Sequence, residues 1–270
     1  MKKNMNEIGV SICVLTYEQS WEKIKMTLDS IICQKEVDFE IVISDDGSEE
    51  NYYEEIRNYF QDKLYTDYTF ISSGRNTGTV QNLIRASKVC KKSYVKMISP
   101  GDCFLEEGTL CRWLEFLIKS GKRWSFADVD SYQIEEGVIR KVDVEEHPKL
   151  KEEYRKGDDE LSRWNYVVLN DIAVGAAMII EKDLFCEYLS KIEGRLVYAE
   201  DNIYRLMMYD GVVGVYYPQS AILYECNCGI STCGDRKWNE LVSKDWNETN
   251  RMMVETYNPD DLIHRRVMNA

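Results

Sequence analysis

The sequence lacks the two glycine-rich signatures with which many α/β proteins bind dinucleotides and nucleoside triphosphates. No Gly-x-Gly-x-x-Gly follows the first expected strand, residues 10–15, and no Gly-Lys-Ser/Thr of the Walker type occurs among the 270 residues. Those glycines let the backbone approach a pyrophosphate or surround phosphate groups. NAD-linked chemistry and P-loop phosphoryl transfer therefore lose their main support.

Positive charge is scarce relative to negative charge. The chain has 34 Lys and Arg against 47 Asp and Glu, which gives a formal net charge of -13. Binding to a nucleic-acid backbone depends on clustered cations, so this balance argues against DNA or RNA as a partner. An anionic substrate would need a metal ion or local hydrogen-bond donors to screen its charge.

Zinc-binding patterns are also missing. The nine cysteines are scattered through apolar segments, as at Cys13 and Cys90, and this favours reduced, buried thiols in a cytosolic protein. The one cluster, Cys226-x-Cys228 with Cys233, lacks the paired two-residue spacing of a zinc ribbon. The two histidines of the chain lie far from it in sequence, so no zinc site is predicted.

Long apolar runs are absent. The longest, such as residues 172–180, fall well short of the roughly 20 residues that cross a bilayer. No apolar segment follows the charged first residues at once, so no signal peptide is predicted. We expect a protein that is soluble or attached to a membrane surface.

What the chain does contain is an alternation of β-branched apolar runs with segments of helical periodicity. This order predicts a parallel sheet with right-handed crossovers, and so an α/β, Rossmann-like fold with a mostly parallel central sheet flanked by helices. The charged segment 135–160 predicts a solvated hairpin or loop with a helical part. Strands are expected at 10–15, 39–44, 68–72, 94–98 and 174–180, with helices around 24–32, 51–60, 79–90 and 182–189.

Polar residues stand where the second strand ends, as Asp45-Asp46-Gly47-Ser48. Ligands of open α/β sheets sit outside the carboxyl ends of the strands, so we expect the active site here. Thr16 and Tyr17 end the first strand and offer a hydroxyl and a ring to a nucleotide base. The alternative is a turn followed by a helix cap, which the same residue types favour.

Several short strings occur in an order that resembles one family. Each string alone is common, and their shared order over roughly residues 9–238 carries the resemblance to the family-2 nucleotide-sugar glycosyltransferases, which have the A-type glycosyltransferase fold. The strings are Val10 to Tyr17, Ser30 to Gln34, Glu40 to Ser48, Asn76-x-Gly78, Ser99 to Asp102, Gly175 to Met178, Glu200-Asp201 and Gly229 to Ser231.

The resemblance implies roles for these residues. Asp46 would accept a hydrogen bond from a base N–H, and Asp201 would act as the general base on the acceptor hydroxyl, with Glu200 beside it. The alternative for this acidic pair is the start of a helix, where acidic side chains complement the dipole. The implied nucleotide-binding residues are Thr16, Tyr17, Asp45, Asp46, Asn76 and Gly101, and the implied donor or acceptor loop contains Gly229, Ser231 and Thr232.

A divalent cation, Mn²⁺ or Mg²⁺, is also implied, with Asp102 as its ligand. A departing diphosphate needs its charge neutralised, which a cation held by hard oxygen ligands supplies. This chain departs from the family pattern, because Ser99 stands at the position of the first aspartate. The departure predicts weak metal affinity, and the alternative is a Pro-Gly turn closed by an aspartate.

The implied enzyme is an inverting glycosyltransferase of the hexosyltransferase type. It would move a sugar from a nucleotide sugar, a UDP-sugar, to a glycan or lipid-linked glycan acceptor in bacterial surface polysaccharide synthesis. We expect one domain, 1–235, with a nucleotide-binding half at 9–102, an acceptor-binding half at 103–235 and a helical tail at 236–270. The expected location is the cytoplasm.

Three questions stay open at the level of the sequence. The stripe of Trp238, Leu241, Val242, Trp246 and Met253 in the tail fits buried core, a homodimer contact or contact with the inner face of a membrane. A non-catalytic protein that binds nucleotide sugars or carbohydrate is an alternative, made credible by the reduced metal motif. A sugar nucleotidyltransferase is another, although the glycine-rich, lysine-containing start of such enzymes is missing.

Overall fold

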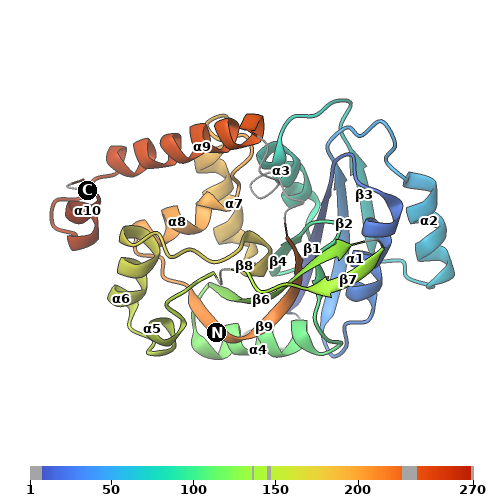
Figure 1. Ribbon diagram of the computed structural model, residues 1–270, viewed down its shortest axis with the longest axis horizontal. Coiled ribbons are helices and arrows are strands. Elements are labelled where there is room, and N and C mark those ends of the chain that lie inside the picture. Colours follow the sequence, from blue (N-terminus) through green and yellow to red (C-terminus); the bar gives the residue numbers. More distant parts are fainter. Residues whose placement is uncertain (1–7, 136, 145–146, 227–235, 269–270) are drawn as a thin grey trace.

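The computed structural model describes residues 8–135, 137–144, 147–226 and 236–268. Its centre is a nine-stranded sheet in the order β3-β2-β1-β4-β8-β6-β9-β5, with β7 paired to β6 beside this path (Figure 1). The strands are β1 Gly9–Thr16, β2 Asp38–Asp45, β3 Tyr68–Ser72, β4 Tyr94–Ile98, β5 Cys103–Phe104, β6 Trp124–Glu135, β7 Val138–Lys141, β8 Met178–Glu181 and β9 Val215–Glu225.

The sheet is mixed, with most strands parallel. Strands β1, β2, β3 and β4 are parallel neighbours, and β6 pairs with β9 in the same direction. Strands β5, β7 and β8 run against their neighbours. The expected Rossmann-like architecture with a mostly parallel sheet is confirmed.

Helices cover both faces of this sheet, because its central strands bury side chains on both sides. Ile12 and Val14 of β1 pack into one core with α1, α2 and α4, whereas Cys13 packs into the other with α3, α7 and α8. The helices are α1 Trp21–Ile32, α2 Tyr53–Asp62, α3 Thr79–Val89, α4 Thr109–Ser120, α5 Lys151–Arg155, α6 Asp159–Arg163, α7 Lys182–Ile192, α8 Asn202–Tyr209, α9 Arg236–Glu255 and α10 Leu262–Met268.

The strand predicted at residues 174–180 is wrong in its first half. Residues Gly175–Ala177 form a 3-10 turn, and β8 begins only at Met178. Lys96 of β4 donates a hydrogen bond to the Ala176 carbonyl, and the Ala177 N–H bonds to the Val174 carbonyl at 2.8 Å. These bonds bend the chain, so its small residues pass close to the carboxyl end of β4.

The strands expected from the sequence do not include β6 and β9, the two longest strands among the described residues. Asp128 and Asp130 interrupt the apolar pattern of β6, and Pro218, Gln219 and Ser220 interrupt that of β9. The two strands pair in parallel with register shifts around Asp128. The hairpin expected in the charged segment is confirmed, because β7 returns along β6 and α5 follows.

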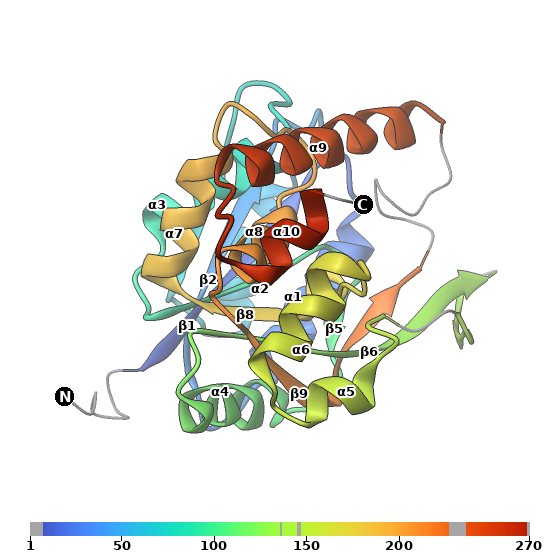
Figure 2. The same ribbon diagram turned by 90° about the vertical axis from the view of Figure 1, so that its left-hand side faces the viewer.

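Helix α9 lies against α8 and the segment that precedes it. In Figures 1 and 2 it runs along one edge of the molecule, opposite α4. Asp245 of α9 is 4% exposed, and its Oδ2 accepts hydrogen bonds from the backbone N–H groups of Val197, Tyr198 and Ala199 at 3.0, 2.6 and 2.9 Å. Thr249 accepts a further bond from Asn202 at 2.8 Å. Helix α9 therefore fixes the backbone just before α8.

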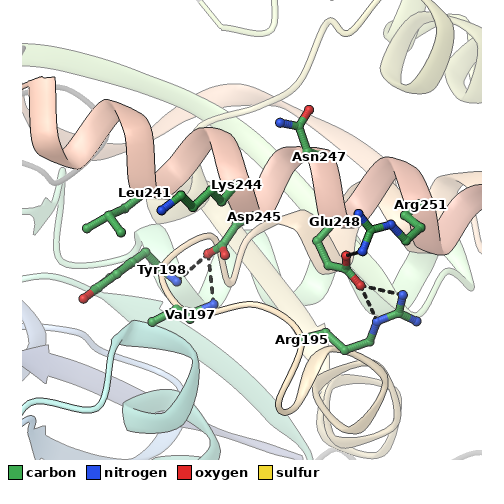
Figure 3. Close-up of a pocket in the computed structure, with 9 residues that line it drawn as sticks. All are labelled: Arg195, Val197, Tyr198, Leu241, Lys244, Asp245, Asn247, Glu248 and Arg251. Atoms are coloured by element: carbon green, nitrogen blue, oxygen red, sulfur yellow. Dashed lines mark hydrogen bonds and ion pairs between the residues drawn. The ribbon is translucent and has the colours of Figure 1, made fainter.

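Asp245 lies at the side of a pocket between α9 and residues 195–198 (Figure 3). The volume of this pocket is about 480 Å³. Arg195 forms ion pairs there with Glu248 at 2.6 Å and with Glu255 at 2.6 Å. These pairs tie the same segment to α9 a second time. Within the described ranges, no helix combines the length and the apolar character that a membrane crossing needs.

Replacing Asp245 should weaken the attachment of α9 to the rest of the fold. Asp245→Ala leaves three backbone N–H groups without their acceptor, so we expect the free energy of unfolding to fall by about 2–4 kcal/mol. Asp245→Asn keeps an acceptor oxygen and should lose clearly less. Urea unfolding measures both. A loss below about 0.5 kcal/mol in Asp245→Ala, the range of ordinary surface substitutions, would contradict this account of the helix.

Candidate active site

A cleft of about 600 Å³ opens at the carboxyl ends of β1, β2 and β4. Its other walls come from residues 172–176, the segment before α8, the end of β9 and the start of α9. The predicted residues that line it are Thr16, Tyr17, Asp46, Asn76, Asp102, Glu200 and Asp201. Asp45 and Gly101 lie behind the lining, and Gly229, Ser231 and Thr232 lie outside the described residues.

Asp45 is fully buried and organises the turn after β2. Its Oδ2 accepts hydrogen bonds from the N–H groups of Gly47 and Ser48 at 3.0 and 3.1 Å and from the Ser72 hydroxyl at 2.8 Å. The register of the sheet brings these groups together, because Asp45 pairs with both Thr16 and Ser72. Asp45 thus joins the carboxyl ends of β1, β2 and β3, and it is not among the described residues that line the cleft.

Asp46 lines the cleft, and its carboxylate is also engaged by the chain. Oδ1 accepts from Arg85 at 2.6 Å and from the Thr77 hydroxyl at 2.7 Å, and Oδ2 accepts from the N–H groups of Thr77 and Gly78 at 3.0 and 2.8 Å. A carboxylate offers about four acceptor sites. A base N–H would therefore have to share Asp46 with these donors, and the evident task of Asp46 is to shape the loop before α3.

Glu200 and Asp201 lie side by side on the cleft wall, partly exposed, just before α8. Loss of hydration at the cleft wall, and then the charge of Asp201, raises the pKa of Glu200 to about 8, and loss of hydration also raises the pKa of Asp201. Two adjacent carboxylates in such a place share a proton near neutral pH. The pair is thus suited to proton transfer with a bound hydroxyl group.

Gly175 lets the backbone of the 3-10 turn pass close to this pair. A Cβ at this position would stand 3.1 Å from Asp201 Oδ2, which is tighter than ordinary van der Waals contact. The 3-10 turn that replaces the expected strand therefore brings bare backbone against the carboxylate.

Asp102 follows β4 and is 4% exposed. Its Oδ1 accepts a hydrogen bond from the Glu225 N–H at 3.0 Å, and burial raises the pKa of Asp102 to about 7. Lys96 is fully buried nearby, donates to the carbonyls of Met97 and Ala176, and has a pKa lowered to about 7 by burial. The charge of each group favours the charged form of the other.

The carboxylates near the end of β4 fit a hard divalent cation as part of its coordination shell. Asp102 and Glu225 both line the cleft and offer the oxygen ligands that Mg²⁺ and Mn²⁺ prefer. Among the described residues no group of three or more His, Cys, Asp or Glu is arranged to hold a metal. A cation here would take the rest of its ligands from phosphate and water.

Several residues in or beside the cleft were missed by sequence reasoning. Arg85 binds Asp46 from α3, and a cation among the apolar residues of that helix was an available signal. Glu225 gave no signal, because β9 itself was not recognised. The ring of Tyr198 packs edge-on against Trp238 of α9 with centroids 5.2 Å apart. Trp238 and Trp246 line the cleft, so part of the aromatic stripe faces the site.

The raised pKa of Glu200 makes the pair destabilising at high pH. Its folded pKa of about 8 lies above the ordinary 4.5, so the folded chain holds a proton that the unfolded chain has released. Stability should therefore fall as pH rises from about 5 to about 8. Glu200→Gln removes this titration. The unfolding free energy of the variant, relative to that of the native chain, should therefore increase as the pH rises from about 5 to about 8. Urea unfolding at several pH values measures it.

Glu107→Gln is the matched control, because Glu107 is exposed and pairs with Lys35 on the surface. Its stability profile should follow that of the native chain. If the Glu200→Gln profile also ran parallel to the native profile over the whole range, the raised pKa of Glu200 would be refuted.

Comparison with known proteins identifies the fold. The solved structure of S. aureus TarS has a TM-score of 0.63 at 15% identity, and the match covers 97% of this chain but only 42% of that one. TarS 1–349 with UDP-GlcNAc has a TM-score of 0.61 at 16% identity, covering 96% and 69%. The mannosyltransferase PcManGT from Pyrobaculum calidifontis, with GDP-Man and Mn²⁺, has a TM-score of 0.62 at 13% identity, covering 95% and 68%.

At these identities the structures support the A-type glycosyltransferase fold alone. No protein with a curated description matches the chain. The model of the family described as Glycosyl transferase family 2 matches residues 11–184, which is well over half of the sequence. The expectation of a glycosyltransferase, drawn from the order of the motifs, is thus confirmed at the level of the family. This chain belongs to Glycosyl transferase family 2.

Proposed function

We propose that the protein transfers a sugar from a UDP-sugar to a glycan or lipid-linked glycan acceptor, with inversion of the anomeric centre. The carrying observation is that the Glu200–Asp201 pair, with its raised pKa values, lines the same cleft as Asp46 and Asp102. The nucleotide sugars in the TarS and PcManGT structures support the class of donor. The proposed setting, bacterial surface polysaccharide synthesis in the cytoplasm, rests on the family resemblance.

The base of the nucleotide is proposed to lie beside Tyr17 and Asn76. Tyr17 directly follows β1 and is 37% exposed at the cleft. Tyr198 approaches from the opposite wall, close enough that, after burial, the charge of Asp46 helps to raise its pKa. The two rings offer stacking faces to a planar base. A ring N–H of the base would share Asp46 with Thr77 and Arg85, and we propose that this base is uracil.

Asp102 is the residue proposed to hold the divalent cation. A bound Mn²⁺ or Mg²⁺ would neutralise the charge that collects on the diphosphate as the glycosidic bond breaks. Lys23 of α1 lines the same corner and brings a positive charge of the protein's own. The donor's phosphates are thereby proposed to lie between the start of α1 and the loop after β4, residues Ser99 to Asp102, which we call the motif loop.

Asp201 is proposed as the base and Glu200 as its protonated neighbour. The two carboxylates share a proton, and because the pKa of Glu200 is raised to about 8, we propose that Glu200 carries this proton and that Asp201 is the ionised partner. Asp201 takes the proton of the acceptor hydroxyl while that oxygen attacks the anomeric carbon. The bond from this carbon to the diphosphate oxygen breaks, and the diphosphate leaves with the electron pair. One displacement of this kind inverts the centre.

The aromatic stripe of α9 is proposed to serve the cleft. Trp238, Val242 and Trp246 line it, at a spacing that places them on one face of the helix. Met253 is fully buried. These positions support an acceptor wall more than a membrane contact or a homodimer contact through the same residues.

A non-catalytic binding protein is the second candidate, favoured by the serine at position 99. The test is Asp201→Asn, which keeps the shape of the side chain and removes its basicity. We expect the affinity for UDP-GlcNAc, by titration calorimetry, to stay within about threefold, because the base is not needed for binding. Transfer, or slow hydrolysis with water as acceptor, should fall about 10²-fold or more. NMR of the released sugar should show the inverted anomer.

Asp210→Asn is the control, because Asp210 caps the far end of α8 and pairs with Lys191 outside the cleft. It should leave turnover unchanged. Near-native turnover in Asp201→Asn, or a retained anomer, would refute the mechanism. Tight binding of UDP-GlcNAc with no turnover by the native chain would favour the binding protein.

A further inference from the structure

Glu225, at the end of β9, lies directly over the motif loop after β4. Strands β5 and β9 are antiparallel, with Cys103 opposite Leu223 and Phe104 opposite Ile222. Two residues further along, this register sets Gly101 against Glu225. The hydrogen bond from the Glu225 N–H to Asp102 Oδ1 continues the pairing into the loop. A carboxylate from a distant strand thus reaches the loop in which the family's first aspartate is replaced by Ser99.

Gly101 makes room for this carboxylate. Its φ is +103°, a conformation that side chains rarely adopt, and a Cβ there would collide with Glu225 Oε2. The space beside the loop that a side chain at position 101 would fill is therefore occupied by Glu225. Sequence and packing agree, because position 101 has no side chain where β9 supplies a carboxylate.

The charges around Glu225 face the cleft. The side chain of Glu225 is 5% exposed, and the Lys23 ammonium approaches its Oε2 to 2.8 Å. Lys23, Asp102 and Glu225 all line the cleft. Two carboxylates thus lie close together at the cleft, with Lys23 beside Glu225 and the buried Lys96 near Asp102. Their oxygens are the ligands that a hard divalent cation prefers.

We propose that Glu225 supplies the cation-binding carboxylate that the motif loop lacks at Ser99, so that Asp102 and Glu225 together hold the divalent cation. Lys23 then exchanges Glu225 for the phosphates of the donor. This inference rests on the proposed function, since it concerns the cation that would accompany a nucleotide sugar. Glu225 would be a ligand of the cation, and the absence of a side chain at Gly101 would leave the space that Glu225 occupies.

Titration calorimetry of UDP with and without Mn²⁺ tests the proposal. The native chain should bind UDP more tightly with Mn²⁺, and Glu225→Gln should reduce this gain at least about tenfold. UDP affinity without Mn²⁺ should stay within about threefold or improve, because a negative charge near the phosphates is removed. Glu107→Gln, the same change at an exposed ion pair, should keep the full gain.

A second variant moves the carboxylate back into the loop. Ser99→Asp combined with Glu225→Gln should recover a measurable part of the Mn²⁺ gain. Lys23→Met should increase the gain, because it frees Glu225 from its ion pair. If circular dichroism shows that Glu225→Gln does not fold, Lys23→Met still tests whether Glu225 binds the cation. A purely structural pair between α1 and β9 predicts no change of the gain in Lys23→Met.

An unchanged Mn²⁺ gain in Glu225→Gln would overturn the inference. So would a native chain whose UDP affinity ignores Mn²⁺, and that result would leave sugar transfer to be judged by the Asp201→Asn assay. A chain that gains affinity through Asp102 but not Glu225 would keep the proposed function and lose this inference.

Discussion

The cleft depends on two buried carboxylates at the end of β2. Asp45 collects donors from the turn after β2 and from β3, and Asp46 collects donors from the loop before α3 and from Arg85. Hydrogen bonds to charged, buried groups are among the stronger ones in proteins, and leaving such a group unpaired is expensive. These bonds keep the loops open at the carboxyl edge of the sheet. Thr16, Tyr17 and Asn76 can then face a ligand.

The second half of the chain is joined to this edge through its backbone. The Val80 N–H at the start of α3 bonds to the Val197 carbonyl at 3.0 Å, and the Val197 N–H bonds to Asp245 of α9. The segment that leads to Glu200 and Asp201 is thus held between the start of α3 and α9. These hydrogen bonds set the position of the Glu200–Asp201 pair relative to the carboxyl ends of the strands, so α9 is part of the geometry of the cleft.

The parallel strands could be predicted because burial on both faces leaves an unbroken apolar run, as in β1 and β2. The cleft could be predicted from the polar residues that end those runs. Strands β6 and β9 could not, since Asp128 and Pro218 break the pattern and pairing across the sheet supplies what the pattern lacks. Glu225 could not be predicted as a cleft residue for the same reason, because it lies at the end of β9. Neither could the sequence separate Asp45 from Asp46, because only the fold decides which carboxylate reaches the cleft.

Each proposed role of a cleft residue depends on nucleotide binding at the carboxyl edge of the sheet. Hydrogen–deuterium exchange with and without UDP measures where the nucleotide binds. We expect slower exchange in three segments, residues 16–19, 73–79 and 197–201, which come from separate parts of the chain and meet in this cleft or at its rim. Unchanged exchange in 16–19 and 73–79, with slowing confined to the pocket between α9 and residues 195–198, would contradict it.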